Sequence, residues 1–148
     1  MEHDNQANVE RLKDEVIQEY GVNPQRDDLP HDVSRWVELI HENLTSESLT
    51  VNWLIEQHPE LSKKTSERFC VVKGVSTKTY IIQLRMFLAS RLIEEGESHI
   101  MAVAMNVGYD DNSSFTKSFA KFVGCLPSLY KKVRGGNSSD FTSKNSSL

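Results

Sequence analysis

The sequence of 148 residues predicts an all-α fold. Apolar residues recur at intervals of three and four along most of the chain, and no run keeps the two-residue alternation of a half-buried strand for long. Residues that commonly cap helix starts, and glycines that commonly end helices, also divide the chain into segments of helical length. These observations together favour a chain of consecutive helices.

An acidic arm, residues 1–30, comes first and contains one predicted helix. The arm carries an apolar stripe at helical spacing, formed by Val9, Leu12, Val16 and Tyr20. Gly21 is the expected stop, and a polar loop with two prolines follows it. We expect this helix to be detachable from the rest of the chain.

Residues 31–76 contain three predicted helices. The first lies within residues 31–44, with an apolar face formed by Val33, Trp36, Val37, Ile40 and Leu44. Thr50 can cap a short second helix, and Ser62 can cap a third helix that ends at Gly74.

A long connector helix is predicted over residues 77–96, opened by Ser76 and ended by Gly96. Residues 97–134 then begin with a short helix that ends near Gly108. Either Asp110 or Asp111 caps the next helix. That helix is expected to bury three phenylalanines at helical spacing: Phe115, Phe119 and Phe122.

Pro127 suits the first position of a last short helix, which is expected to extend through Tyr130. The remaining residues, 135–148, are rich in Gly, Ser and Asn and are predicted to be disordered.

Charge is distributed unevenly along the chain. The net charge is −4, but residues 1–60 hold 4 Lys and Arg against 14 Asp and Glu, whereas residues 61–134 hold 12 against 6. A split of this kind indicates a basic working surface joined to an acidic arm.

Other classes of protein find no support in the sequence. The two cysteines and five histidines are dispersed, with no metal-ligand spacing and no nucleophile motif, so we expect no metal, no cofactor and no enzymatic activity. No stretch is long and apolar enough to span a membrane, and the N-terminus lacks a secretory signal. We therefore expect a cytoplasmic protein.

The order of short helix, turn and longer helix occurs twice, at about residues 50–73 and 98–123, which makes two helix-turn-helix units. Residues 33–134 resemble the DNA-binding domain of the bacterial AraC/XylS transcription regulators. The second unit carries the clearest matches, at Ile100, Val103, Ala104, Gly108, Tyr109, Ser113, Phe115, Phe119, Gly124, Pro127 and Tyr130. The connector region matches at Gly74, Ser76, Tyr80, Arg85, Ala89 and Leu92.

The resemblance implies that the helix over about residues 112–122 is a recognition helix, which enters a DNA major groove. Burying its phenylalanines turns the opposite face outward. Short polar and basic side chains suit that face, because they donate and accept at base edges without repelling phosphate. By the resemblance, the residues that touch bases are Asn112, Ser113, Thr116 and Lys117, while Lys121 suits a phosphate better.

The first unit departs from the family pattern. Thr65 and Arg68 stand where apolar residues are usual, so we expect its longer helix to pack loosely or to sit differently. The positions expected to face the groove are Lys63, Ser66 and Glu67, with Lys64 beside them. We expect Lys63 and Lys64 to lie near phosphate, and whether this unit touches bases stays open.

We therefore expect a sequence-specific transcription regulator whose two recognition helices read adjacent major-groove segments of duplex DNA. The alternative is a protein-interaction module on the same fold that has lost DNA binding, which the net acidity and the residues Thr65, Arg68 and Glu67 favour. Arg85, in the connector, either pairs with an acid between the two units or touches phosphate.

The acidic arm is our candidate for self-association, for docking on RNA polymerase, or for folding back onto the basic surface. Many family members carry an effector-binding barrel, and the 30 residues ahead of the first family helix are too few to form one. We therefore expect a small stand-alone regulator controlled by its abundance or by a partner; the alternative is that the chain is an excerpt of a longer protein.

Overall fold

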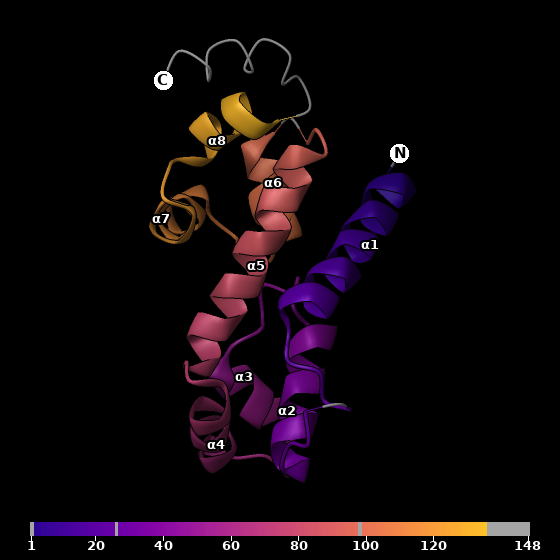
Figure 1. Ribbon diagram of the computed structural model, residues 1–148, viewed down its shortest axis with the longest axis vertical. Helices are drawn as coiled ribbons and strands as arrows, with labels where there is room; N and C mark the ends of the chain where they lie inside the picture. The colour runs from indigo at the N-terminus through magenta and orange to yellow at the C-terminus, as the bar shows by residue number, and fades with distance from the viewer. Residues whose placement is uncertain (1, 26, 98, 136–148) are drawn as a thin grey trace.

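The computed structural model describes residues 2–25, 27–97 and 99–135, and the predicted tail lies outside them except for Gly135. All regular structure in the described residues is helical, which confirms the all-α prediction (Figure 1). The helices are α1 (Glu2–Tyr20), α2 (His31–Glu42), α3 (Val51–Gln57), α4 (Lys63–Lys73), α5 (Thr77–Glu94), α6 (Ile100–Asn106), α7 (Asn112–Val123) and α8 (Pro127–Arg134).

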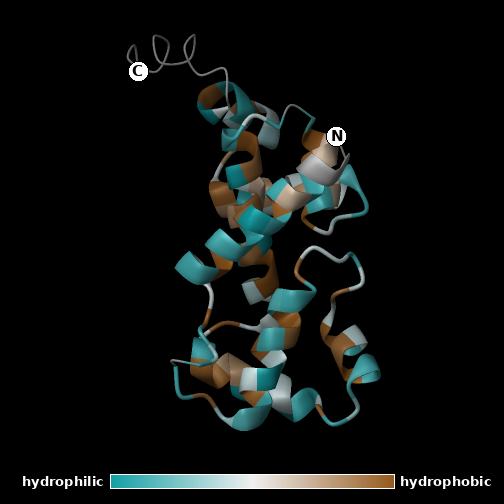
Figure 2. Ribbon diagram, turned by 90° about the vertical axis from the view of Figure 1, so that its right-hand side faces the viewer, coloured by the Kyte–Doolittle hydropathy of each residue, from teal (hydrophilic) through white to brown (hydrophobic). Residues whose placement is uncertain are grey.

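Helix α5 connects two groups of helices. Figure 1 shows α2, α3 and α4 at one end of α5, and α6, α7 and α8 at the other end. Helix α1 lies alongside α5. Apolar residues of both groups contribute to the buried core. Figure 2 shows how apolar and polar residues alternate along the helices. The arrangement agrees with two helix-turn-helix subdomains on a long connector, preceded by one N-terminal helix.

The helix starts are set by side chains that the sequence already indicated. Thr50 accepts a hydrogen bond from the backbone N–H of Trp53, and Ser76 accepts one from that of Thr79. Ser62 accepts from the N–H of Lys64, and so each of these helices begins with a satisfied donor. The last helix runs to Arg134, one turn further than predicted.

The first subdomain is held together by polar contacts that replace the apolar ones usual at Thr65 and Arg68. Thr65 is buried, and its hydroxyl donates to Asp32 Oδ2 of α2 at 3.1 Å. The Nε of Arg68 donates to the same oxygen at 3.0 Å, and this guanidinium lowers the pKa of the Asp32 carboxyl. The expectation that α4 packs loosely is therefore wrong, because a carboxylate on α2 satisfies both departures.

The apolar stripe of α1 is buried within the chain. Val9, Leu12 and Val16 belong to the core, where α1 packs on α5. The ring of Tyr20 is partly exposed and stacks on Phe87 of α5, with centroids 3.8 Å apart. This differs from the expectation of a detachable helix, because the stripe finds its apolar partner in α5.

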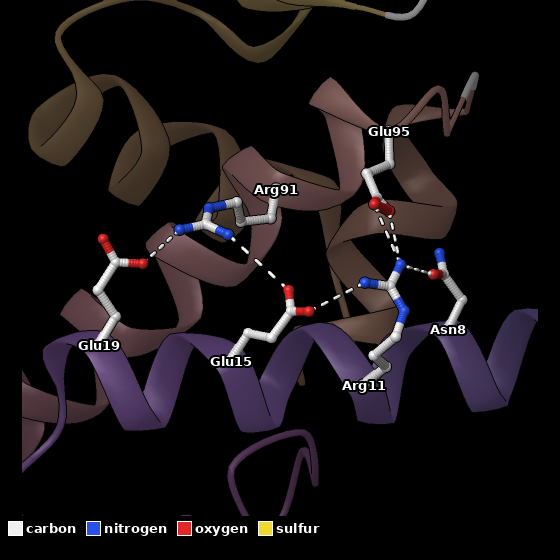
Figure 3. Close-up of polar contacts among 6 residues, drawn as sticks. All are labelled: Asn8, Arg11, Glu15, Glu19, Arg91 and Glu95. Carbon is white, nitrogen blue, oxygen red and sulfur yellow. Dashed lines mark hydrogen bonds and ion pairs between the residues drawn. The ribbon is translucent and has the colours of Figure 1, made fainter.

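Ion pairs line the outer edge of the contact between α1 and α5. Figure 3 shows Arg11 between Glu15 and Glu95, and Arg91 of α5 between Glu15 and Glu19. The Arg11 guanidinium is 2.9 Å from Glu95 Oε2, and that of Arg91 is 2.5 Å from Glu19 Oε2. The acids of the arm are thus partly neutralised by basic residues of α1 and α5.

Candidate nucleic-acid interface

Helix α7 begins with a cap that the sequence left undecided between two acids. Asp111 is the N-cap, and its Oδ1 accepts from the backbone N–H of Ser114 at 2.6 Å. This hydrogen bond lowers the pKa of the Asp111 carboxyl. Asp111 is therefore a charged residue that satisfies the start of the helix.

The inner side of α7 is anchored by two phenylalanines, not three. Phe115 and Phe119 are fully buried, as predicted. Phe122 is 36% exposed, which corrects the prediction for this residue. It lies in the last turns of α7, where its ring meets Phe87 of α5 edge-on, with centroids 5.2 Å apart. Phe122 therefore borders the core rather than forming part of it.

The outer side of α7 carries the residues predicted to meet DNA. Asn112, Ser113, Lys117 and Lys121 are exposed, and Thr116 is half-buried. Among the described residues, neither lysine forms an ion pair with the protein's own acids. This face thus presents an amide, two hydroxyls and two ammonium groups to solvent.

The α4 residues predicted to face DNA differ from one another in their exposure to solvent. Lys63, Lys64 and Glu67 are exposed. Ser66 is half-buried, and its hydroxyl lies 3.2 Å from Oγ1 of Thr77, which also accepts from Trp36 Nε1 at 3.0 Å. The Ser66 hydroxyl is therefore engaged with α5, whereas the two lysines point away from the core.

An open cleft of about 580 Å³ lies beside α5, between the two groups of helices. It is lined from both groups by residues that include Thr50, Asn52, Lys78, Ile82, Ser114 and Ser118. Sequence reasoning did not single out Lys78 of α5, which adds an exposed cation to the wall of this cleft. Its basic character was visible, but its position depends on how the two subdomains are arranged.

Arg85 does not pair with an acid between the two units in the described part of the chain, which was one of the two roles predicted for it. It is buried in α5 and donates to the backbone carbonyl oxygens of Leu44 and Ser46. It is hydrogen-bonded to the first subdomain through neutral groups, and it also lines the cleft beside α5. The sequence offered no signal for this, because both acceptors are main-chain atoms some 40 positions away.

A group of metal ligands, a paired cysteine or a long apolar helix would indicate another kind of site. Among residues 5–25, 27–97 and 99–135, no three His, Cys, Asp or Glu side chains are grouped as metal ligands would be. Both cysteines are free, Cys70 being exposed and Cys125 half-buried. Of the described helices, none combines the length and apolar character that crossing a membrane requires.

Known proteins resemble this chain in the same region. Residues 60–132 match a family model described as a helix-turn-helix domain. The virulence regulon transcriptional activator VirF of Yersinia enterocolitica is 36% identical over 62 residues, which are 42% of this chain and 23% of that protein. The melibiose operon regulatory protein of Escherichia coli K12 is 28% identical over 101 residues, 68% of this chain and 33% of that protein.

A solved structure is similar over most of the fold. It is the C-terminal domain of AraT, a response regulator from Geobacillus stearothermophilus, with a TM-score of 0.68 and 27% identity. The match covers 73% of this chain and 89% of that one. The chain thus spans a quarter to a third of the two curated relatives, but nearly all of this separately solved domain.

Proposed function

Since this chain carries an AraC-type helix-turn-helix DNA-binding domain, homologous to that of AraC family transcription regulators, we propose that it reads two adjacent major-groove segments of duplex DNA. Helices α4 and α7 are the two recognition helices. The observation that carries the proposal is the outer face of α7, where Asn112, Ser113 and Lys117 are exposed while Phe115 and Phe119 hold the opposite face in the core. The protein acts in the bacterial cytoplasm, where its target lies.

The side chains of α7 match the chemistry of base edges. An asparagine can bond adenine bidentately, serine and threonine can bond either a donor or an acceptor, and lysine can donate to the acceptors of guanine. Asn112, Ser113, Thr116 and Lys117 thus read bases. Lys121 lies one helical turn after Lys117, and we assign it to the phosphate backbone.

In this proposal the first subdomain mainly fixes the position of the protein on the DNA, and it contributes less to the preference for particular bases. Lys63 and Lys64 are exposed at the start of α4 and donate to phosphate. The Ser66 hydroxyl already has a partner in Thr77, so it contributes less to base recognition than a free hydroxyl would. Glu67 accepts from cytosine or repels phosphate. Most of the base preference therefore comes from α7.

The separation of the two recognition helices depends on α5. Its 18 residues give a length of about 27 Å at 1.5 Å per residue. Successive major-groove exposures on one face of DNA are about 34 Å apart. A rigid connector of this size suits two neighbouring segments, with the DNA bending to close the difference. Lys78, in the cleft beside α5, then approaches the phosphates that join the two segments.

The test is selection of bound duplexes from a random pool, followed by salt titration. We expect a selected site with two segments about one helical turn apart. Lys117→Ala should relax base preference at one position, at a cost of about 1–3 kcal/mol for the preferred base. Lys121→Ala should keep the preference and reduce the salt slope by about one. No binding to any duplex at low salt would instead support the protein-interaction module.

We also propose that the arm binds a basic protein surface, with RNA polymerase as the candidate, rather than a second copy of the chain. The apolar stripe is buried on α5, so the face that remains carries exposed acids, among them Glu10 and Asp14. Two copies of one acidic face repel each other. Purified polymerase should bind the wild-type chain more tightly than the Asp14→Lys variant, and equal binding would contradict this assignment.

A further inference from the structure

Arg85 joins the connector helix to the first subdomain. The residue is only 8% exposed, and its Nε donates to the carbonyl oxygen of Leu44 at 2.9 Å. One terminal nitrogen of the same guanidinium donates to the carbonyl oxygen of Ser46 at 2.7 Å. Both acceptors lie in the segment between α2 and α3, and these two helices pack on α4. The guanidinium therefore holds the main chain that supports the first recognition helix.

The other side of the same guanidinium meets the second subdomain. A Cβ placed on Gly108 would lie 2.7 Å from a terminal nitrogen of Arg85, so the bare Cα of glycine makes this approach possible. The φ of Gly108 is +99°, a conformation that L side chains rarely adopt. The ring of Tyr109 faces the Arg85 Cζ, with its centroid 5.6 Å away. Arg85 is thus enclosed from both sides.

The contacts continue into the second recognition helix. Tyr109 meets Phe115 edge-on, with ring centroids 5.6 Å apart, and Phe115 is one of the two phenylalanines that anchor α7. A continuous series of contacts therefore runs from Leu44 and Ser46 through Arg85 to Tyr109 and α7.

The groups that compensate the buried positive charge of Arg85 are unusual. Within the described part of the chain, the partners of Arg85 are two carbonyl oxygens and an aromatic ring, none of them a carboxylate. Burial lowers the pKa of its guanidinium. A planar fork of donors can bond two carbonyls while it lies against a ring, and the ammonium group of a lysine lacks that geometry. An apolar residue would suffice if packing were the only requirement.

We infer that Arg85 is a positioning residue that fixes the orientation of α4 relative to α7. This rests on the proposed reading of two groove segments. Because the two recognition helices are held rigidly, contact of one with DNA presents the other at the correct place, and the second contact becomes intramolecular. Arg85 therefore makes two weak contacts act as one binding event and sets the spacing that the protein accepts.

The experiment compares the wild-type chain with Arg85→Lys on the duplex obtained by selection. One series of duplexes changes the spacing between the two segments by one or two base pairs, and another scrambles one segment. Arg91→Lys is the matched control, because it lies on the same helix but pairs with Glu15 and Glu19 of α1. Thermal melting shows that each variant is folded.

We expect Arg85→Lys to lose about tenfold or more in affinity for the full site while binding the single-segment duplex as the wild type does. Its preference for one spacing should flatten, and Arg91→Lys should keep the wild-type preference. A folded Arg85→Lys protein with the wild-type spacing preference and the wild-type ratio of full-site to single-segment affinity overturns the inference. Should Arg85→Lys not fold, Tyr109→Leu takes its place, since it removes the ring but keeps both hydrogen bonds.

A second measurement separates this inference from the proposed function. Spin labels at Lys64→Cys and Lys121→Cys, in a Cys70→Ser and Cys125→Ser background, report the distance between α4 and α7 in the free protein. The distance distribution should broaden in Arg85→Lys and stay narrow in Arg91→Lys. If the wild type shows no preference for a two-segment site, the proposed function fails, and this distribution still decides the role of Arg85. An unchanged distribution refutes that role.

Discussion

The replacement Leu12→Ala tests whether α1 is an integral part of the fold. Leu12 is 1% exposed and lies in the middle of the stripe between Val9 and Val16. Removing a fully buried leucine side chain costs about 2–5 kcal/mol, as lost burial plus a cavity. Since Leu12 is fully buried where α1 packs on α5, we expect about 3 kcal/mol, near the middle of that range.

The ion pairs of Figure 3 should matter much less than this apolar contact. The side chain of Arg11 is 51% exposed and that of Glu95 is 40% exposed, so water and salt screen their attraction. Arg11→Ala is therefore the matched control on the same helix. It should change the stability far less than Leu12→Ala, and its small effect should disappear at high salt.

The assay is urea unfolding, monitored by circular dichroism and, separately, by tryptophan fluorescence. Both tryptophans lie in the first subdomain, Trp36 on α2 and Trp53 on α3, so fluorescence reports the unfolding of that subdomain and not of α1 itself. If α1 unfolds together with the body, Leu12→Ala shifts both transitions to lower urea by the same amount. The reasoning is refuted if the fluorescence of Leu12→Ala keeps the wild-type midpoint while part of its circular dichroism signal is lost at lower urea. That result would mean that α1 detaches on its own.

The remaining predictions concern pH and the phenylalanines of α7. Burial lowers the pKa of His41 from 6.5 to about 4, so the folded state binds this proton more weakly than the unfolded chain does. Stability from this residue is complete above pH 6.5 and falls as pH drops toward 4, with a loss of about 2 kcal/mol at pH 5. The urea midpoints at pH 7.5 and pH 5 should therefore differ more for the wild type than for His41→Gln. Equal differences for the two proteins would contradict the lowered pKa of His41. Phe119→Ala should cost about 3–5 kcal/mol because Phe119 is fully buried, whereas Phe122→Ala should cost clearly less because its ring is 36% exposed. Equal losses of stability in thermal melts of these two variants would show that Phe122 belongs to the core after all.

The starts and ends of the helices were largely predictable because their signals are local. Thr50, Ser62, Ser76 and Asp111 each accept from a backbone N–H two or three residues ahead. Gly74 and Gly124 end α4 and α7 in the left-handed conformation. Such contacts span a few residues, so the sequence contains both partners side by side. The alternation of buried and exposed residues on α7 follows in the same way from helical periodicity.

Contacts between distant segments were not predictable on the same basis. The loose packing expected for α4 was wrong because Asp32, more than 30 positions earlier, satisfies Thr65 and Arg68. The role of Arg85 was missed because its acceptors are carbonyl oxygens, which every residue possesses.

The amino-acid sequence alone thus determined which segments are helical, where they begin, and which side of α7 is exposed to solvent. These outcomes depend on neighbours within one or two helical turns. Only the tertiary structure decided that α1 lies on α5, that Phe122 stays at the rim, and that one buried arginine meets both subdomains. These outcomes depend on contacts between residues that lie 23 to 84 positions apart in the sequence, and no local pattern contains both partners of such a contact.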